Sequence, residues 1–381
     1  MTQGLTRRGL MAAAGAAAIA PVAAPAFAAE PSLNDLARAN GRFFGSAVGA
    51  GDAGVTASLG DQTYRRLLTR ECGLLVCENE MKWYVLRPDP ETFDFSRADR
   101  IADFARENGM DLRGHTLLWH HPQWFPAWVA THDFGPQPAT AAEAMVVDHI
   151  QRVAGRYPQI RSWDVVNETV DAETGELRET ALSRAMGQSV LDVAFHAARE
   201  AAPQAQLVYN DYMSWEAGHE KHRAGVLRLL EGFKARGVPI DALGVQSHIG
   251  SGNSDNSVGF DTAQEREWGA FMDEVVGMGL EIVITEFDVH DKNLPADIPS
   301  RDAAVADLGR RYLDQMLAYP QTTGVVAWGM ADSHTWLQGN WPRADRLPKR
   351  PTPYDAEGRA KPLREAIAAA FRAAPARPAT A

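Results

Sequence analysis

Short apolar runs recur along the chain and alternate with stretches of helical periodicity. Eight runs have the length and composition of buried strands, at Phe43–Val48, Leu74–Cys77, Leu112–Leu118, Trp163–Val166, Leu207–Tyr209, Ala242–Val245, Ile282–Ile284 and Val325–Trp328. Two of the stretches between them place apolar residues on one helical face, at Met186, Val190, Val193 and Ala197 and at Val305, Leu308, Tyr312 and Met316. Strands that alternate with helices predict a parallel sheet.

Eight strand–helix units in a chain of 381 residues predict a closed (β/α)8 TIM barrel of the α/β class. An open, doubly wound sheet is the alternative, but no run is followed by the G-x-G-x-x-G pattern of a dinucleotide-binding fold. We therefore predict a single barrel domain over residues 29–372. Its active site is expected at the C-terminal ends of the strands.

Polar residues lie within the last residues of seven of the eight runs or directly after them. They are Glu78, Asn79, Glu80 and Lys82; His115, Trp119 and His120; Asn167 and Glu168; Asn210, Asp211 and Tyr212; Gln246, Ser247 and His248; Glu286 and Asp288; and Asp332. Any one of these sets, taken alone, is typical of a helix cap or a satisfied loop group. Seven sets at the same topological position indicate a common site, because the C-terminal ends of barrel strands share one face.

Two carboxylates stand out in these sets. Glu168 and Glu286 end the fourth and seventh runs, which lie on opposite arcs of a barrel mouth. Two acids across a cleft suit the cleavage of a glycosidic bond, in which one acid protonates the leaving oxygen and the other attacks the anomeric carbon. Indole faces match the apolar faces of sugar rings. We expect Trp119, Trp328 and Trp336 in the cleft, and Trp163, Trp215 and Trp268 in the core or on helix surfaces.

Composition narrows the possible partners and cofactors. The formal net charge is -11 and no basic stripe is present, which argues against nucleic acid as a partner. Cys72 and Cys77 are the only cysteines, and no Cys/His set has metal-ligand spacing, so no metal is expected. The two cysteines are interpreted as buried thiols, with a short disulfide as the alternative. We expect a monomer that needs no cofactor.

The two ends of the chain are expected to lie outside the barrel. Residues 1–28 contain the pair Arg7-Arg8, an Ala-rich apolar stretch and the A-x-A site that ends at Ala28, a pattern typical of a twin-arginine signal peptide. We therefore expect export to the periplasm or the medium, with no membrane anchor, because no apolar run is long enough to span a bilayer. The Ala/Pro-rich residues 373–381 are predicted to be a disordered tail.

Eight short motifs carry a family resemblance. They are Glu78-Asn79-Glu80-Met81-Lys82-Trp83, Arg113-Gly114-His115-Thr116, Trp119-His120, Trp163-Asp164-Val165-Val166-Asn167-Glu168, Tyr209-Asn210-Asp211-Tyr212, Gln246-Ser247-His248, Ile284-Thr285-Glu286-Phe287-Asp288 and Trp328-Gly329. By these motifs the chain resembles glycoside hydrolase family 10, mostly endo-β-1,4-xylanases, from about residue 43 to residue 367. The resemblance implies a substrate of xylan or xylo-oligosaccharides.

The resemblance also implies roles for individual residues. Glu168 matches the acid/base and Glu286 the nucleophile of a retaining mechanism, for which the two carboxyl groups stand about 5 to 5.5 Å apart. The implied substrate contacts are Glu78, Asn79, Lys82, His115, Trp119, Asn167, Tyr212, Gln246, His248, Trp328 and Trp336. Among them, Asn167 matches a contact to the sugar 2-hydroxyl. Asp288 and Asn210 are expected to support the site, Asp288 by orienting the imidazole of His248.

The chain departs from the family pattern at several places. Phe287 follows the expected nucleophile where Leu is usual, and residues 312–326 lack a cysteine pair that many members carry. The loop 120–128 differs from the usual short Ser-Gln-x-Pro pattern, and residues 333–342 are also unusual. Three alternatives to xylan hydrolysis remain open: cleavage of cellulose, mannan or galactan by the same carboxylates, transglycosylation, and carbohydrate binding without catalysis.

Overall fold

The computed structural model describes Met1, residues 30–250 and residues 261–378. The predicted signal peptide, apart from Met1, and the last three residues of the predicted tail lie outside the described residues. Residues from Ser32 onward form one compact unit. None of the helices within the described ranges is both long and apolar enough to cross a membrane.

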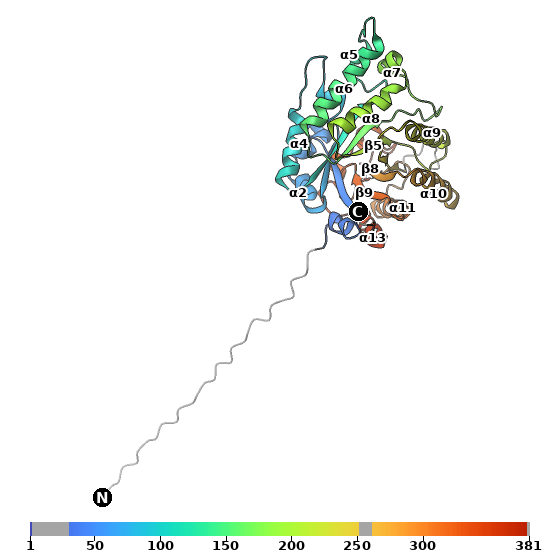
Figure 1. Cartoon of the computed structure of the whole chain (residues 1–381). Coiled ribbons are helices and arrows are strands. Elements are labelled where there is room, and N and C mark those ends of the chain that lie inside the picture. Colours follow the sequence, from blue (N-terminus) through green and yellow to red (C-terminus); the bar gives the residue numbers. More distant parts are fainter. Residues whose placement is uncertain (2–29, 251–260, 379–381) are drawn as a thin grey trace. The chain divides into compact units, whose positions relative to one another are not determined.

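The described part contains nine strands that alternate with helices (Figure 1). The strands are β1 (Phe43–Val48), β2 (Leu74–Cys77), β3 (Asp111–Trp119), β4 (Ser162–Asn167), β5 (Gln206–Asp211), β6 (Ala242–Val245), β7 (His248–Ile249), β8 (Glu281–Val289) and β9 (Thr322–Ala327). Eight of them coincide with the eight predicted runs, although several begin or end a few residues away. The last one, β9, ends one residue before Trp328.

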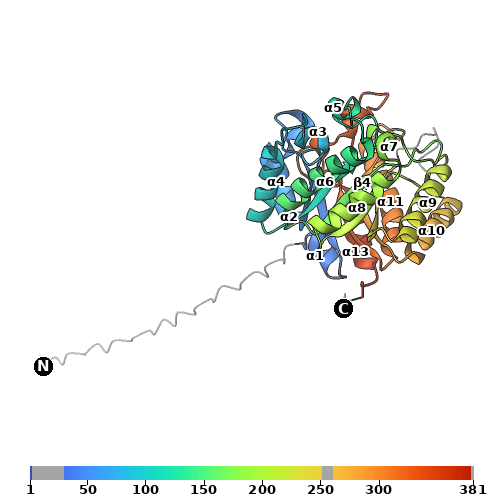
Figure 2. The ribbon, with the colours of Figure 1, turned by 45° about the horizontal axis from the view of Figure 1, so that its top comes forward.

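The helices follow the same alternation. The α-helices are α1 (Leu33–Arg38), α2 (Gln62–Glu71), α3 (Trp83–Leu86), α4 (Ser96–Glu107), α5 (Ala127–Ala130), α6 (Pro138–Arg156), α7 (Ala181–Met186), α8 (Ser189–Ala201), α9 (Glu220–Arg236), α10 (Thr262–Gly277), α11 (Ile298–Leu317), α12 (Leu337–Asn340) and α13 (Pro362–Ala373). Two 3-10 helices, η1 (Gly54–Gly60) and η2 (Asp332–His334), complete the set. Figure 2 shows the long helices arranged around the outside of the strands.

The sheet closes on itself into an eight-stranded parallel barrel. Strands β1 to β6 pair in chain order, β6 pairs with β8, β8 with β9, and β9 with β1, all in parallel. The predicted closed barrel is therefore confirmed, and the open sheet is excluded. The two-residue strand β7 was not predicted; it pairs only with β8, opposite Asp288 and Val289.

One of the two predicted helical stretches is wrong, because the structure divides it between two helices. Met186 ends α7, whereas Val190, Val193 and Ala197 belong to α8, because Gly187 between them has φ of +70°. A helix cannot continue through this left-handed backbone conformation. The second predicted stretch is confirmed, since Val305, Leu308, Tyr312 and Met316 all lie buried on one face of α11.

The N-terminal ends of the strands are closed by side chains from distant parts of the chain. Arg42 donates to the carbonyl oxygens of Leu317, Thr322 and Pro375. Arg377 donates to the Pro320 carbonyl at 2.9 Å and pairs with Glu281 at 2.5 Å. The prediction of a disordered tail from residue 373 is therefore wrong for residues 373–378: α13 includes Ala373, and the segment after it is held at the base of the barrel.

The packing between β3 and β4 depends on a glycine. A Cβ atom on Gly114 would meet the ring of Trp163, a fully buried side chain, at 1.9 Å. The indole therefore occupies the space that any other residue at position 114 would need.

We expect Gly114→Ala to lower the free energy of unfolding by about 2 to 3 kcal/mol, because overpacking beside a rigid ring forces the strands apart. Gly155→Ala is the matched control, since Gly155 lies in α6 with no atom near the added methyl group. Thermal unfolding of both variants measures the difference. Equal melting temperatures would contradict the expected steric role of Gly114.

Candidate active site

The polar residues that follow the strands meet at one mouth of the barrel, because all eight strands run parallel. They are not helix caps: the side chains that cap helices in the described part of the chain are Ser32, Asp61, Thr180, Asp261 and Asp297. The strand-end side chains are thus free to build a site around Glu168, which follows β4, and Glu286, which lies in β8.

Glu168 sits on a backbone of unusual conformation. Its φ of +53° is rare for a residue other than glycine and costs free energy. Two contacts hold this conformation: the Glu168 amide donates to the Asn210 carbonyl at 2.9 Å, and the Glu168 carbonyl accepts from Arg178 Nε at 3.1 Å. The turn directs the carboxylate into the mouth instead of along the strand.

Within the described part of the chain, the side chains that donate hydrogen bonds to the Glu168 carboxylate are all neutral. Trp119 Nε1 donates to Oε2 at 3.0 Å, while Gln246 Nε2 and Asn167 Nδ2 donate to Oε1 at 2.8 and 3.2 Å. Burial raises the pKa of Glu168, and the negative charges of Asp211 and Glu286 raise it further, against the effect of the hydrogen bonds. Its environment therefore favours the protonated form.

The carboxylate of Glu286 has the opposite environment. Asn210 Nδ2 donates to Oε1 at 2.9 Å, and His248 Nε2 lies 3.2 Å from Oε2. Burial alone would raise the pKa of Glu286, but the hydrogen bond with His248 and the charges of His115, His248 and Lys82 lower it to about 2. Glu286 is therefore ionised at neutral pH.

His248 supplies the charge that holds Glu286 ionised. Its Nδ1 atom lies 3.0 Å from Asp288 Oδ1, so the imidazole bridges two carboxylates. Burial disfavours the imidazolium, but the carboxylates of Asp288 and Glu286 outweigh burial and raise the pKa of His248 to about 10. The predicted role of Asp288 in orienting His248 agrees with this contact.

Two amide side chains link the carboxylates. Asn210 Nδ2 donates both to Glu286 Oε1 and to Asn167 Oδ1, each at 2.9 Å, and Asn167 in turn donates to Glu168. Thr285 Oγ1 fixes the other end of the Asn210 amide with a hydrogen bond of 2.7 Å. The chain of contacts sets the two acids at neighbouring positions, and the separation of about 5 to 5.5 Å stays a prediction.

Aromatic and imidazole side chains form one wall of the mouth. Trp336 Nε1 donates to Asp288 Oδ2 at 2.8 Å, and its ring packs 4.8 Å from that of His248. The Trp328 ring makes edge contacts with His115 at 5.4 Å and His248 at 6.4 Å. The structure thus brings Trp328 and Trp336 to the site as predicted, while Trp163, Trp215 and Trp268 are buried in the core.

A second group of polar residues comes from the segment after β2. Lys82 Nζ donates to Asn79 Oδ1 at 3.1 Å and lies 4.6 Å above the Trp119 ring. Burial lowers the pKa of Lys82 although the charges of Glu286, Glu78 and Glu168 oppose this. Burial raises the pKa of Glu78 to about 7, with Lys82 acting against it. Lys82 is therefore a buried member of the site and not a solvated surface charge.

Tyr212 directly follows β5 and contacts Arg178. Its hydroxyl accepts from Arg178 Nη2 at 2.8 Å, and the same guanidinium donates to the Glu168 carbonyl. The predicted site residue Tyr212 is therefore tied to the acid by a shared arginine.

Sequence reasoning missed three supporting residues. Asp164 is fully buried and binds Arg113 and His115, with His115 Nδ1 at 2.8 Å from Asp164 Oδ2. A charged residue in the middle of an otherwise apolar strand was a signal that could have found it. Arg178 and Asp211 were also missed as supports; Asp211 accepts from Tyr209 and lies 3.1 Å from His222 Nε2.

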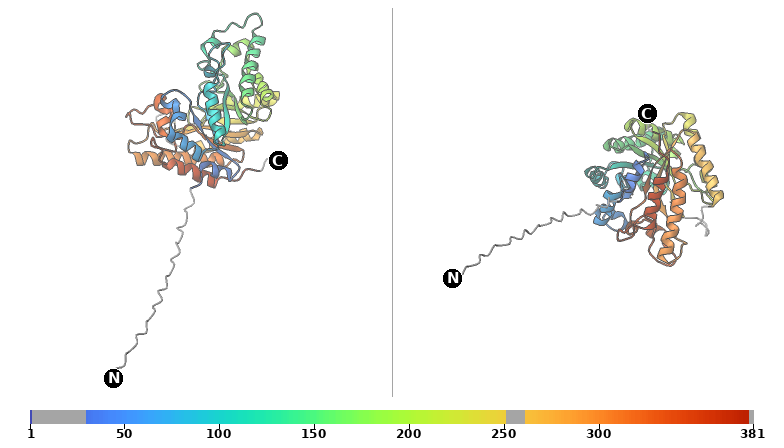
Figure 3. Two further views of the ribbon diagram at one scale, coloured as in Figure 1. Left: turned by 90° about the vertical axis from the view of Figure 1, so that its left-hand side faces the viewer. Right: turned by 90° about the horizontal axis from the view of Figure 1, so that it is seen from below.

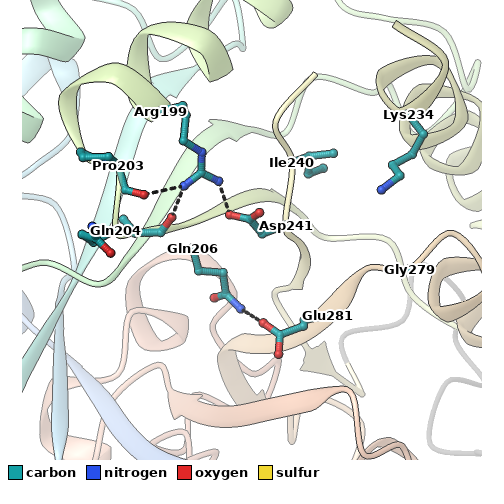
Figure 4. Close-up of a pocket in the computed structure, with 10 residues that line it drawn as sticks. Arg199, Pro203, Gln204, Gln206, Lys234, Ile240, Asp241, Gly279 and Glu281 are labelled. Carbon is teal, nitrogen blue, oxygen red and sulfur yellow. Dashed lines mark hydrogen bonds and ion pairs between the residues drawn. The ribbon is translucent and has the colours of Figure 1, made fainter. Parts of the chain in front are cut away.

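A hollow lies at the opposite end of the barrel (Figure 4). It has a volume of about 540 Å³ and is lined by residues that precede β5, β6 and β8. Two contacts cross its lining: Arg199 pairs with Asp241 at 2.5 Å, and the Gln206 amide donates to Glu281 at 2.6 Å. Both carboxylates of this hollow, Asp241 and Glu281, are thus engaged by side chains of its own lining.

The described residues contain no cluster of three or more His, Cys, Asp or Glu side chains that could hold a metal ion. Cys72 and Cys77 are free, buried thiols, so the alternative of a disulfide is excluded. Burial raises the pKa of both thiols well above the usual range, which leaves them protonated.

Comparisons with known proteins agree with the geometry. The model of glycosyl hydrolase family 10 matches residues 32–370. The chain is 34% identical to endo-1,4-beta-xylanase 1 of Humicola insolens over 322 residues, which cover 83% of this chain and 68% of that protein. It is 34% identical to a beta-1,4-xylanase of Dictyoglomus thermophilum over 291 residues, 73% of this chain and 76% of that protein.

A solved structure shows the same architecture. A mutant of Xylanase10C from Cellvibrio japonicus, in complex with xylopentaose, superimposes with a TM-score of 0.78 at 27% sequence identity. The match covers 91% of this chain and 70% of that chain. The barrel fold is thus shared with a protein whose solved structure contains xylopentaose.

The charge on His248 should make the stability of the fold depend on pH. The folded-state pKa of about 10 lies above the ordinary value of 6.5, so the contribution of the imidazolium is fully present below pH 6.5 and is lost as pH rises towards 10. We expect His248→Asn to have a lower melting temperature than the unmodified protein at pH 6, and the gap to narrow by pH 10. Melting curves across this range measure it, and a gap independent of pH would contradict a charged His248.

Proposed function

Since the chain belongs to glycosyl hydrolase family 10, we propose that it cleaves internal β-1,4-xylosidic bonds of xylan with Glu286 as the nucleophile and Glu168 as the acid/base. The protein is an endo-1,4-β-xylanase, the activity for which its relative from Humicola insolens is named. The residue roles rest on one observation: a cationic imidazole hydrogen-bonds Glu286, while the described side chains that donate to Glu168 are neutral.

The first chemical step forms a covalent glycosyl-enzyme. Glu286 attacks the anomeric carbon as the bond from that carbon to the leaving oxygen breaks, and Glu168 gives its proton to that oxygen. The low pKa of Glu286 keeps its lone pair available, and the raised pKa of Glu168 keeps its proton in place.

The second step releases the sugar. Glu168, now ionised, takes a proton from water as the water oxygen attacks the anomeric carbon, and Glu286 leaves as a carboxylate. Two inversions give net retention of the anomeric configuration. Asn210 stays bonded to Glu286 in the free enzyme and so fixes the carboxylate plane for attack.

The residues around the two acids have roles in holding the sugar. Asn167 lies between the acids and can meet a sugar 2-hydroxyl, a contact that strengthens in the transition state. Lys82, Asn79 and Glu78 offer donors and acceptors for hydroxyls on one side of the mouth, and Trp328 and Trp336 offer an apolar wall. The same set includes His115, Trp119, Gln246, His248 and Tyr212.

We further propose that the protein is exported through the twin-arginine route before it acts as a monomer. The support is the sequence pattern of residues 1–28, and a polysaccharide substrate, too large to enter a cell, agrees with it.

Replacement of the two acids should affect activity differently. We expect Glu286→Ala to lower xylan hydrolysis by roughly 10⁴-fold or more, because no nucleophile remains. Glu168→Gln should lose xylan hydrolysis. It should keep the glycosylation step for an aryl xylobioside whose leaving group needs no proton. The rate of that step should no longer fall at high pH, because no acid remains to lose its proton. Reducing-sugar release and aryl-group release measure the two substrates.

The control for the acid replacements is Glu274→Gln, an exposed carboxylate on α10, which should retain full activity. Carboxymethylcellulose and mannan serve as control substrates. Full xylan hydrolysis by Glu286→Ala would refute the assignment of the nucleophile, and equal rates on mannan would refute the substrate class.

Replacement of Arg7 and Arg8 by Lys should block export. The twin-arginine pair is read by the export machinery as a sequence, so the conservative change is expected to leave the full-length precursor inside the cell. Fractionation of cells that express both forms, followed by immunoblotting, measures the distribution. Export of the Lys-Lys form at the normal level would exclude this route.

A further inference from the structure

The connection between β3 and α6, residues 120–137, carries an exposed indole at the mouth of the barrel. The left view of Figure 3 shows this teal segment extending beyond the strands. Trp124 within it is 39% exposed, although large apolar side chains are otherwise mostly buried in the described residues. The segment includes the loop 120–128 that departs from the pattern of the family.

Trp124 is joined to the catalytic acid through one neighbouring ring. The Trp124 and Trp119 rings stack with centroids 5.0 Å apart and an interplanar angle of 19°. Trp119 Nε1 donates to Glu168 Oε2 at 3.0 Å. An aromatic surface therefore runs from Glu168 outward to solvent.

The open end of this surface is Trp124 and not Trp119. The Trp119 ring has the Lys82 ammonium 4.6 Å above it as well as the stacked Trp124 ring. Both contacts use the π-surface of Trp119, and its Nε1 edge is bonded to Glu168. Trp124, at 39%, is the more exposed of the two rings, and this exposed part is where another flat group can stack.

The loop holds Trp124 in place. Its amide donates to the His121 carbonyl at 3.0 Å, and the Gln123 amide donates to His121 Nδ1 at 3.2 Å. On one side of this turn, His120 is buried between the hydroxyls of Thr169 and Thr180, at 2.8 and 3.0 Å. On the other side, Trp128 Nε1 donates to the Arg87 carbonyl at 3.1 Å.

We propose that Trp124 is a sugar-stacking platform that binds a xylosyl unit of the substrate chain outside the units that contact the two acids. The inference rests on the proposed function. A pyranose ring presents apolar C–H faces, and an indole is the side chain that matches such a face over the largest area. A ring held by stacking and by a bonded turn gives this contact without losing side-chain freedom on binding.

The platform predicts a dependence on substrate length. A short aryl xylobioside fills only the positions at the acids, whereas xylohexaose can also reach Trp124. We expect Trp124→Ala to lower kcat/KM for xylohexaose by about 3- to 10-fold, mostly through KM, and to change kcat/KM for the aryl xylobioside by less than about 2-fold. Trp124→Phe keeps a stacking ring and should retain most of the xylohexaose rate.

A structural role of Trp124 gives a different result. If the ring only supported Trp119, Trp124→Ala would lower kcat/KM equally for xylohexaose and for the aryl xylobioside. This outcome would overturn the proposed platform. Unchanged kinetics on both substrates would also overturn it. Calorimetry of xylohexaose with Glu286→Ala, with and without Trp124→Ala, provides an independent readout, in which the platform requires weaker binding to the double variant.

Failure of the proposed function is distinguishable from these outcomes. It would appear as absence of xylohexaose and xylan cleavage by the unmodified, folded enzyme, whatever stands at position 124. The positions at which xylohexaose is cut by the unmodified enzyme and by Trp124→Ala then show on which side of the acids the platform lies.

Discussion

Two carboxylates buried together in one barrel mouth are the constraint around which the site is built. Two like charges in a poorly hydrated space repel each other, so both cannot be ionised at low cost. The protein resolves this by giving the two acids different neighbours. A histidine held between Glu286 and Asp288 stabilises one negative charge, while amide and indole donors around Glu168 tolerate a neutral acid. The division of labour between proton donor and nucleophile is thus a property of the neighbours and not of the acids.

The support for this asymmetry extends into the core. Asp164 is an anion inside the barrel, and it is accommodated because Arg113 and His115 surround it. Removal of one member of such a buried group is costly, because the charge that remains has lost its partner. The positively charged surroundings of Glu286 therefore depend on residues that never reach the mouth. The unusual backbone of Glu168 is likewise held from outside, by Asn210 and Arg178.

Much of the fold and of the site could be predicted, for identifiable physical reasons. Eight buried runs of the right length specify the strands, and polar residues at their ends specify the mouth. The break at Gly187 was missed because apolar periodicity is insensitive to a single left-handed residue. Strand β7 was missed because two residues carry no periodic signal. The order of residues 373–378 depends on contacts between distant parts of the sequence: Arg42 binds the Pro375 carbonyl 333 residues away, and Arg377 binds the Pro320 carbonyl 57 residues away. Arg178 was missed because it lies in the loop between β4 and α7, where no periodic pattern marks a residue.

The anchoring of the last described residues has a practical consequence. Arg377 binds where β8 begins, so the chain leaves the barrel on the face opposite to Glu168 and Glu286. A bead or a surface attached to the chain at residue 378 would therefore sit behind the catalyst, with the cleft facing the liquid. Polysaccharide chains are too bulky to reach an enzyme that lies face down on its support. Immobilised enzymes usually have to be engineered so that the active site faces the solution. In this protein, the position of the C-terminal segment already provides that orientation.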